Sequence, residues 1–327
     1  MNREWLLNAA LLAGLVVVPG WAVWADEPFT IMLATRAVIF ALAAAGLNIA
    51  LGLGGLVSLG HAVFFGIGGY AMGVLASHAQ NYTPLYDGVF TIQGTKSMPV
   101  IWLAAAVTSG LAAWLIGVLS LRTSGAYFIM ITLAFGQMAY FFAISWPAYG
   151  GEDGLSIYVR NGFPGLNTLD PIQFYGLCLA WLCLVLWGYA RLRRSPFGLA
   201  LDSARQVPDR VRAVGLDPRR LQLVALVLSG AVTGLAGALF ADLNRFVSPS
   251  MLSWQMSGEI IVFVIIGGVA RLFGPVAGAV FYVMMEHWLG GISDYWQIFL
   301  GLVLLAVVLF GRGGLIGMIC GKGRPDA

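Results

Sequence analysis

The feature that most restricts the fold is a series of ten apolar segments, most of them long enough to cross a lipid bilayer. A membrane-spanning helix needs about 20 apolar residues. Since 59% of the 327 residues are hydrophobic and only 10% are charged, the chain lacks the polar groups needed to cover a water-facing surface. We therefore predict an all-α, polytopic integral membrane protein with about ten transmembrane helices in lipid. The predicted segments are 5–24, 30–52, 56–77, 99–120, 124–145, 173–190, 221–243, 257–269, 274–289 and 296–311.

The eighth and ninth segments could form two short helices or one long one. Gly267-Gly268, Arg271 and Gly274-Pro275 favour a break, because Gly-Pro interrupts a helix and an arginine in mid-bilayer is costly. A break also places the basic tail on the same side as loop 191–220, which holds eight of the 18 Lys and Arg. Positive residues collect in cytoplasmic loops. We therefore expect both termini in the cytoplasm.

This topology gives a single membrane domain over residues 1–327, with a cytoplasmic loop at 191–220 and external loops near 78–98 and 146–172. Residues 1–25 resemble a cleavable secretory signal. In a chain that continues to cross the membrane, an uncleaved first helix is the preferred interpretation.

The cytoplasmic loop is the most informative polar stretch. Ser195 could cap a short helix that has Pro196 at its first position, and Gly215 would end another helix before Pro218 begins the next span. A short helix on the cytoplasmic face is a surface on which an ATPase could act. Alternatively, the loop is basic only because of its orientation, and the residues alone leave both interpretations open.

Polar side chains inside apolar segments are candidates for a solute pathway. Glu259 could line the pathway or lie in water at the interface. His61 is better explained by helix packing when it is considered alone. Asn48 could line a polar path or bond a neighbouring helix, and Ser58 is a further pathway candidate. The Gly-rich turns 52–60 and 267–278 are candidates for backbone flexure or for irregular backbone along the path, with Gly267, Gly268, Gly274 and Pro275 as the individual residues.

No motif in the sequence supports chemistry within this chain. Residues 317–323 read G-M-I-C-G-K-G and lack both the spacing and the final Ser/Thr of a P-loop. The three histidines are far apart in sequence, and the net charge of +3 is too small to indicate nucleic acid. We therefore expect no catalytic residues, no metal and no cofactor bound by this chain. The scarcity of charge in the spans also argues against a proton- or sodium-coupled secondary transporter.

Six runs of residues follow one another along the chain and together cover nearly all of it, from about residue 36 to 317. The runs are Gly46-Leu47-Asn48 with Gly52 and 58–70; Leu121-Arg122 with 125–128 and 131–137; 150–155; 195–198 with Ala213-Val214-Gly215-Leu216; Ser229-Gly230 with 234–239; and Gly267-Gly268 with 272–279. In this order they resemble the LivM-type permease family of branched-chain amino acid ABC transporters.

The resemblance implies several partners in the bacterial cytoplasmic (inner) membrane. These are a related second permease of the LivH type, two ABC ATPase subunits that bind ATP and Mg, and an extracytoplasmic solute-binding protein. It also implies that the cytoplasmic loop docks on an ATPase subunit. The coupling candidates are Ser195, Pro196, Phe197, Gly198, Arg205, Asp209, Arg210, Arg212 and Gly215.

The loop departs from the family at one place. The family usually has an acidic stretch after the position of Arg205, where this chain has Gln206, Val207 and Pro208, with Asp209 one place later. This departure puts the individual contact residues in question.

The expected function is a permease subunit that translocates branched-chain amino acids, or related small polar solutes, by alternating access. A permease for urea, short amides or aromatic acids is the main alternative. An ion-coupled secondary transporter, and a membrane scaffold or enzyme that transports nothing, are the competing hypotheses from other classes.

Overall fold

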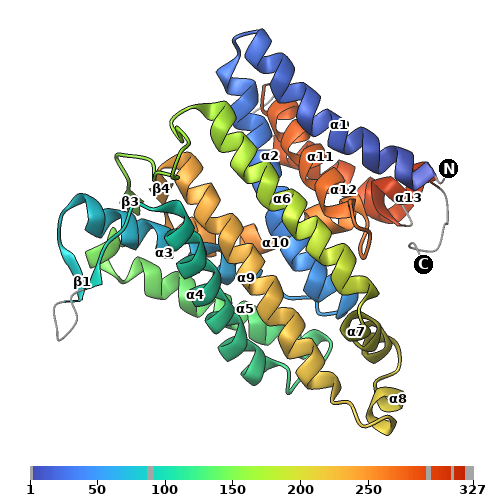
Figure 1. Ribbon diagram of the computed structural model, residues 1–327. Coiled ribbons are helices and arrows are strands. Elements are labelled where there is room, and N and C mark those ends of the chain that lie inside the picture. Colours follow the sequence, from blue (N-terminus) through green and yellow to red (C-terminus); the bar gives the residue numbers. More distant parts are fainter. Residues whose placement is uncertain (1–2, 87–91, 292–295, 311–312, 321–327) are drawn as a thin grey trace.

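The computed structural model describes residues 3–86, 92–291, 296–310 and 313–320, and most of these residues lie in helices (Figure 1). Two short antiparallel strand pairs, β1 with β2 and β3 with β4, lie in loops. The long helices are α1 Arg3–Trp24, α2 Pro28–Asn48, α3 His61–Gln80, α4 Met98–Ser120, α5 Ala126–Ile144, α6 Pro171–Arg194, α9 Pro218–Asn244, α10 Trp254–Gly267, α11 Gly274–Gly290 and α12 Trp296–Phe310. The short elements are η1 Ile49–Leu53, η2 Pro147–Tyr149, α7 Pro196–Gln206, α8 Pro208–Ala213, η3 Pro249–Leu252, α13 Gly314–Cys320, β1 Pro84–Tyr86, β2 Ile92–Gln93, β3 Leu155–Ser156 and β4 Phe246–Val247.

Each of the ten predicted segments overlaps one of the long helices, which confirms an all-α polytopic membrane protein. Among the described residues, seven helices are long and apolar enough to cross a bilayer. These seven are α1, α2 continued by η1, α3, α4, α5, α6 and α9. The last three predicted segments are shorter, since α10, α11 and α12 have 14, 17 and 15 residues.

The predicted break between the eighth and ninth segments is confirmed, because α10 ends at Gly267 and α11 begins at Gly274. The start of the third segment differs from the prediction. It was expected at residue 56, whereas α3 begins at His61 and the backbone of 54–60 is irregular.

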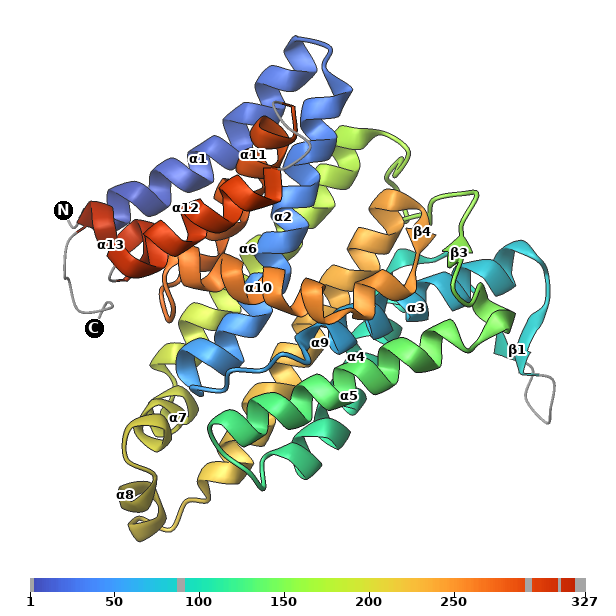
Figure 2. The ribbon, with the colours of Figure 1, turned by 180° about the vertical axis from the view of Figure 1, so that it is seen from behind.

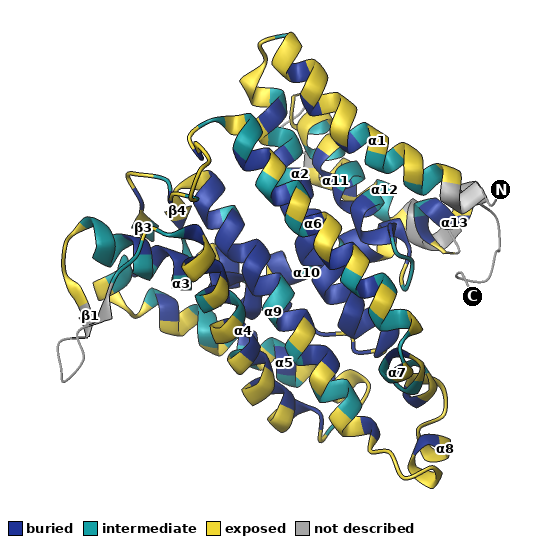
Figure 3. Cartoon of the chain, viewed as in Figure 1, coloured by how far each residue is buried: buried dark blue, intermediate teal, exposed yellow. Residues whose placement is uncertain are grey.

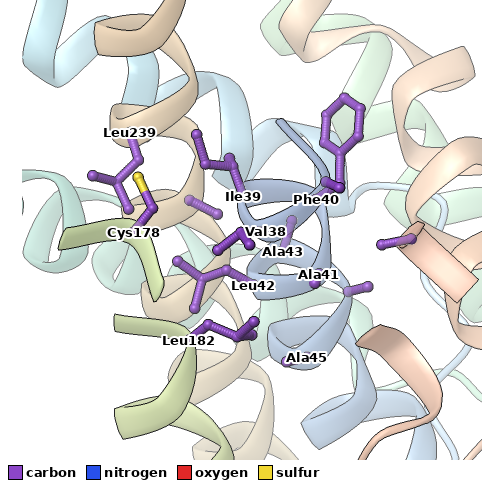
Figure 4. Close-up of a cluster of buried hydrophobic side chains, with 14 of the residues drawn as sticks. Val38, Ile39, Phe40, Ala41, Leu42, Ala43, Ala45, Cys178, Leu182 and Leu239 are labelled. Carbon is purple, nitrogen blue, oxygen red and sulfur yellow. The ribbon is translucent and has the colours of Figure 1, made fainter. Parts of the chain in front are cut away.

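Helices α2 and α9 form the centre of the bundle. Every residue from 37 to 54 is buried, as expected of a helix that is apolar on all sides. Figure 4 shows Ile39 and Leu42 of α2 close to Leu182 of α6 and Leu239 of α9. Helix α1 lies at the edge of the bundle, with only 11% of its span buried, and its outward face is apolar and exposed (Figure 3). That face suits contact with lipid.

The two ends of the bundle carry different features. In Figures 1 and 2, α7, α8, α13 and the start of α1 lie toward one end, and the four strands lie toward the other. The start of α1 therefore lies at the same end as the basic segment 191–220, as the predicted topology requires. The tail residues Lys322 and Arg324 lie outside the described residues.

Glycines bring α3 and α9 into backbone contact. A Cβ atom added at Gly68 would lie 1.9 Å from the carbonyl oxygen of Gly234, and one added at Gly237 would lie 1.8 Å from that of Phe65. No side chain fits at either distance. Small residues at helix interfaces let backbones approach in this way in membranes, where the hydrophobic effect does not drive helices together.

We expect Gly68→Ala and Gly237→Ala each to destabilise the protein by roughly 1–3 kcal/mol, the usual cost of overpacking. Gly176→Ala and Gly188→Ala on α6 are matched controls, because a Cβ atom at either position meets nothing within 4 Å. Thermal unfolding of the purified protein in detergent checks this expectation. Melting temperatures of the Gly68→Ala and Gly237→Ala variants equal to those of the two α6 variants would contradict it.

Candidate functional site

Two irregular stretches of backbone lie together inside the bundle. The first begins where α2 changes into the π-helical turn η1 and continues through 54–60, in which Leu56, Ser58 and Gly60 are buried. The second is the turn 268–273 between α10 and α11. Irregular backbone at membrane depth is tolerated only where protein buries it or where it lines a cavity. In transporters it often marks the moving or binding region.

Asn48 joins the two stretches through its side-chain amide. Its Oδ1 accepts a hydrogen bond from the backbone N–H of Ala270 at 3.0 Å, and its Nδ2 donates to the carbonyl of Arg271 at 3.0 Å. The side chain is 1% exposed. Both the oxygen and the nitrogen of this amide hold the turn against the end of α2. Asn48 therefore bonds a neighbouring segment, which was one of its two predicted roles.

The turn that Asn48 holds is tightly packed. Ala270 adopts φ +64° and Gly268 φ +116°. A Cβ atom at Gly267 would lie 1.6 Å from the carbonyl oxygen of Gly274. Pro275 is in the first turn of α11, where its missing N–H costs no helical hydrogen bond. The structure thus places Gly268 in this close-packed turn and the other three flexure candidates at the helix ends beside it, and their flexing stays a prediction.

Arg205, near the end of α7, contacts the first irregular stretch. Its Nη1 donates a hydrogen bond to the carbonyl of Gly52. Its aliphatic stem lies over Gly55, where an added Cβ atom would be 2.6 Å from Cγ and where φ is +68°. The result is a continuous path of contacts from α7 through Gly52 and Asn48 to the turn 268–273.

A cavity of about 950 Å³ borders this path. Its walls come from α6, α7, η1 and the turn 268–273, and they include Arg193, Arg194 and Arg205. Movement of α7 relative to α6 would therefore change the volume of this cavity.

The local sequence explains why α7 and α8 form. The Ser195 hydroxyl accepts a hydrogen bond from the N–H of Gly198 at 3.2 Å, and Pro196 occupies the first turn, as predicted. Gly215 has φ +88° just after α8 ends, and α9 begins at Pro218. Arg212 pairs with Asp209 at 2.9 Å on the surface, while Arg210 is exposed. Phe197, half-buried, packs toward the cluster that contains Leu201.

His61 and Ser58 hold the start of α3. His61 is fully buried, and its Nε2 lies 2.7 Å from the hydroxyl of Ser229. Because that hydroxyl donates its single proton to the carbonyl of Gly46, at 2.6 Å, His61 Nε2 must be the donor toward Ser229. Ser58 accepts from the N–H of Gly60 at 3.3 Å. Both side chains thus bond to other parts of the protein, as the sequence favours for His61.

Glu259 lies elsewhere, on the wall of a cavity of about 450 Å³ among α2, α5, α9 and α10. The same cavity contains Arg36 of α2, which the sequence reasoning did not name. A signal for it exists, because Arg36 is an arginine inside the apolar segment 30–52. The structure therefore separates Glu259 from Asn48, Ser58 and His61, and gives it a charged neighbour.

Loop 146–172, which the sequence predicts to be external, is fastened to the C-terminal end of α9 by Arg160. Its guanidinium donates to the carbonyls of Thr168 at 2.9 Å, Leu243 at 3.2 Å and Asp242 at 3.3 Å. Burial lowers the pKa of Arg160, and the carboxylate of Asp242 opposes that shift. Strands β3 and β4 pair at the same place. The loop is thus held in one shape on the outer face.

Among the described residues, no group of three or more His, Cys, Asp or Glu side chains could hold a metal ion.

A family model described as "Branched-chain amino acid transport system / permease component" matches residues 29–308. The high-affinity branched-chain amino acid transport system permease protein LivM of Escherichia coli is 29% identical over 94% of this chain and 74% of that protein. LivM of Salmonella typhimurium is 28% identical over the same shares. The probable permease protein LivH of Methanocaldococcus jannaschii is 22% identical over 70% of this chain and 76% of that protein. No solved structure matches the chain.

We expect Asn48→Ala to destabilise the protein by about 1–3 kcal/mol, because it leaves the part-buried N–H of Ala270 and the part-buried carbonyl of Arg271 without their partner. Asn81→Ala is the control, since Asn81 is exposed at the end of α3. Thermal unfolding checks the stability, and hydrogen exchange at Ala270 checks the contact itself. An unchanged exchange rate at Ala270 would show that Asn48 does not hold the turn.

Proposed function

The chain belongs to the family of permease components of branched-chain amino acid transport systems, and we propose that it is the transmembrane subunit of an ATP-driven importer of branched-chain amino acids. Translocation proceeds by alternating access, in which the site opens first to the outside and then to the cytoplasm. The permease names of the relatives support a subunit without enzymatic activity of its own.

The observation that carries the proposal is the surface of α7 and α8. Four large apolar side chains are exposed there, outside the membrane spans: Leu199, Val207, Val214 and Leu216. Exposed arginines surround them, including Arg210 and Arg212. An apolar patch rimmed by charge marks a protein–protein contact. We propose that an ABC ATPase subunit binds here.

The contacts behind this surface give the ATPase a route into the membrane. ATP-driven closure of two ATPase subunits would displace α7, and Arg205 would carry that displacement to Gly52. Asn48 then couples it to the turn between α10 and α11. Packed elements have discrete arrangements and do not deform continuously, so such a shift can switch the exposure of the pathway.

The proposed assembly contains the partners that the resemblance implies. ATP and Mg bind to the two ATPase subunits, and this chain binds no cofactor. A related permease of the LivH type forms the other half of the pathway. A solute-binding protein docks on the external face, where Arg160 holds loop 146–172 in shape. The assembly lies in the bacterial cytoplasmic membrane.

The competing functions, a secondary transporter and a permease for another solute, place different requirements on the surface of α7 and α8 and on the solute site. A secondary transporter acting alone needs no surface such as that of α7 and α8. A permease for urea, short amides or aromatic acids would share that surface and differ in its solute site and binding protein.

The direct test is ATP-driven uptake by the complex isolated from its native membranes. We expect this chain to co-purify with a second permease and two P-loop ATPases, and proteoliposomes of the complex to accumulate leucine, isoleucine or valine with binding protein and ATP. Uptake should survive a protonophore. A chain that purifies alone and transports without ATP would instead establish a secondary carrier.

We expect Arg205→Ala to lower uptake at least tenfold while ATP hydrolysis by the complex continues, because the link between α7 and Gly52 is lost. Arg219→Ala is the control, an exposed arginine at the start of α9. The measurement is the number of amino acid molecules taken up per ATP hydrolysed. A ratio that stays at the wild-type value would exclude Arg205 from coupling.

A further inference from the structure

Three charged side chains from three helices meet toward the outer end of the bundle. Arg36 of α2 forms an ion pair with Glu286 of α11, with Nη2 and Oε1 2.9 Å apart. Glu259 of α10 lies on the wall of the same cavity as Arg36. The guanidinium of Arg36 also lies 5.2 Å from the centre of the Phe40 ring. Arg36 lies more than 200 positions before either glutamate in the sequence, so only the fold brings the three residues together.

The cluster is incompletely paired. Glu259 makes no hydrogen bond or ion pair with any described residue, and Arg36 uses only Nη2. The Oε2 atom of Glu286 is buried and has no hydrogen-bond partner among the described residues. Charged side chains in apolar spans are costly, and they usually mark a pathway or binding site. Both a carboxylate and guanidinium donors are therefore left for a ligand.

Arg36 and Glu259 line the same cavity, which has a volume of about 450 Å³. That volume lies within the range of about 300–1,000 Å³ typical of small-molecule sites. The same wall carries four large apolar side chains, Phe40, Phe240, Met251 and Met256 from α2, α9, η3 and α10, beside the polar Tyr140, Ser250, Ser253 and Gln255. Arg36 also borders a second cavity of about 620 Å³, whose wall contains Glu286.

A pocket with a cation, a separate carboxylate and a group of apolar side chains matches a ligand that carries the complementary groups. We propose that the Arg36–Glu259 pocket holds a zwitterionic α-amino acid with an apolar side chain during transport. Arg36 binds its carboxylate through the free guanidinium donors, and Glu259 binds its ammonium group. The phenylalanine and methionine side chains surround its hydrocarbon. An uncharged amide or urea lacks both ionic contacts.

This inference rests on the proposed function and adds a site to it. The contact path from α7 to the turn 268–273 explains the coupling, whereas the Arg36–Glu259 pocket explains the choice of solute. Planar guanidinium donors bind a carboxylate through two hydrogen bonds, which a lysine cannot reproduce.

The test uses the complete complex in proteoliposomes with a saturating amount of leucine-loaded binding protein, so that delivery of the solute is constant. Glu259→Gln keeps the shape and removes the charge without breaking any described ion pair. We expect it to lower leucine uptake per ATP at least tenfold, and Glu259→Asp to stay within about threefold of wild type. Arg36→Lys keeps a charge beside Glu286 and should lower uptake severalfold. Glu27→Gln, at the outer turn between α1 and α2, is the matched control and should transport normally.

ATP hydrolysis stimulated by the binding protein, measured on the same samples, shows that each variant has assembled. Normal hydrolysis with lost uptake in Glu259→Gln supports the pocket. Wild-type uptake by both Glu259→Gln and Arg36→Lys overturns the pocket and leaves the importer function intact. A wild-type complex that imports an amide or urea but no amino acid overturns the proposed substrate and the pocket together.

Discussion

The structure depends on satisfying the backbone polar groups where its helices are interrupted inside the membrane. No water is available in a bilayer core to bond a free N–H or carbonyl group. At the turn between α10 and α11, the side chain of Asn48 supplies both a donor and an acceptor to that backbone. Around the start of α3, hydroxyl groups do the same work, since Ser257 accepts from the N–H of Ala62 at 2.9 Å. At both of these interruptions, a polar side chain from another helix forms hydrogen bonds with the backbone.

These interruptions lie between the two parts of the molecule to which functions are assigned. On one side, α7 reaches the irregular stretch 49–60 through Arg205. On the other side, α10 and α11 carry Glu259 and Glu286 toward the outer end. Because the turn 268–273 connects α10 to α11, a displacement that reaches it can move both glutamates relative to Arg36 on α2. The proposed coupling path and the proposed solute pocket are thereby joined through a single turn.

Much of the fold could be predicted from the sequence, because its determinants are local. Apolar length located the ten helices, Gly267-Gly268 and Gly274-Pro275 located the break, and Ser195-Pro196 located the start of α7. The start of α3 was placed five residues early, since residues 56–60 are apolar enough to extend a helix, although the glycines of 52–60 already indicate irregular backbone there.

The candidate site was less predictable, because its contacts join distant segments. Asn48 was named from its residue type, but its bonds to Ala270 and Arg271 cross more than 220 positions. The pairing of Arg36 with Glu286 likewise depends on how α2 packs against α11. The only local sign of this pairing in the sequence is that Arg36 is a single arginine within the apolar segment 30–52.

The central claim is that motion of α7 is transmitted through Arg205 and Asn48 to the turn 268–273. The most direct measurement is the distance between spin labels at Val269 in the turn and Leu115 on α4, in the assembled complex with and without ATP trapped on the ATPase subunits. The account predicts that trapped ATP shifts this distance in the wild type, and that Arg205→Ala abolishes the shift while ATP still binds. An identical shift in Arg205→Ala, or no shift in the wild type, would contradict it.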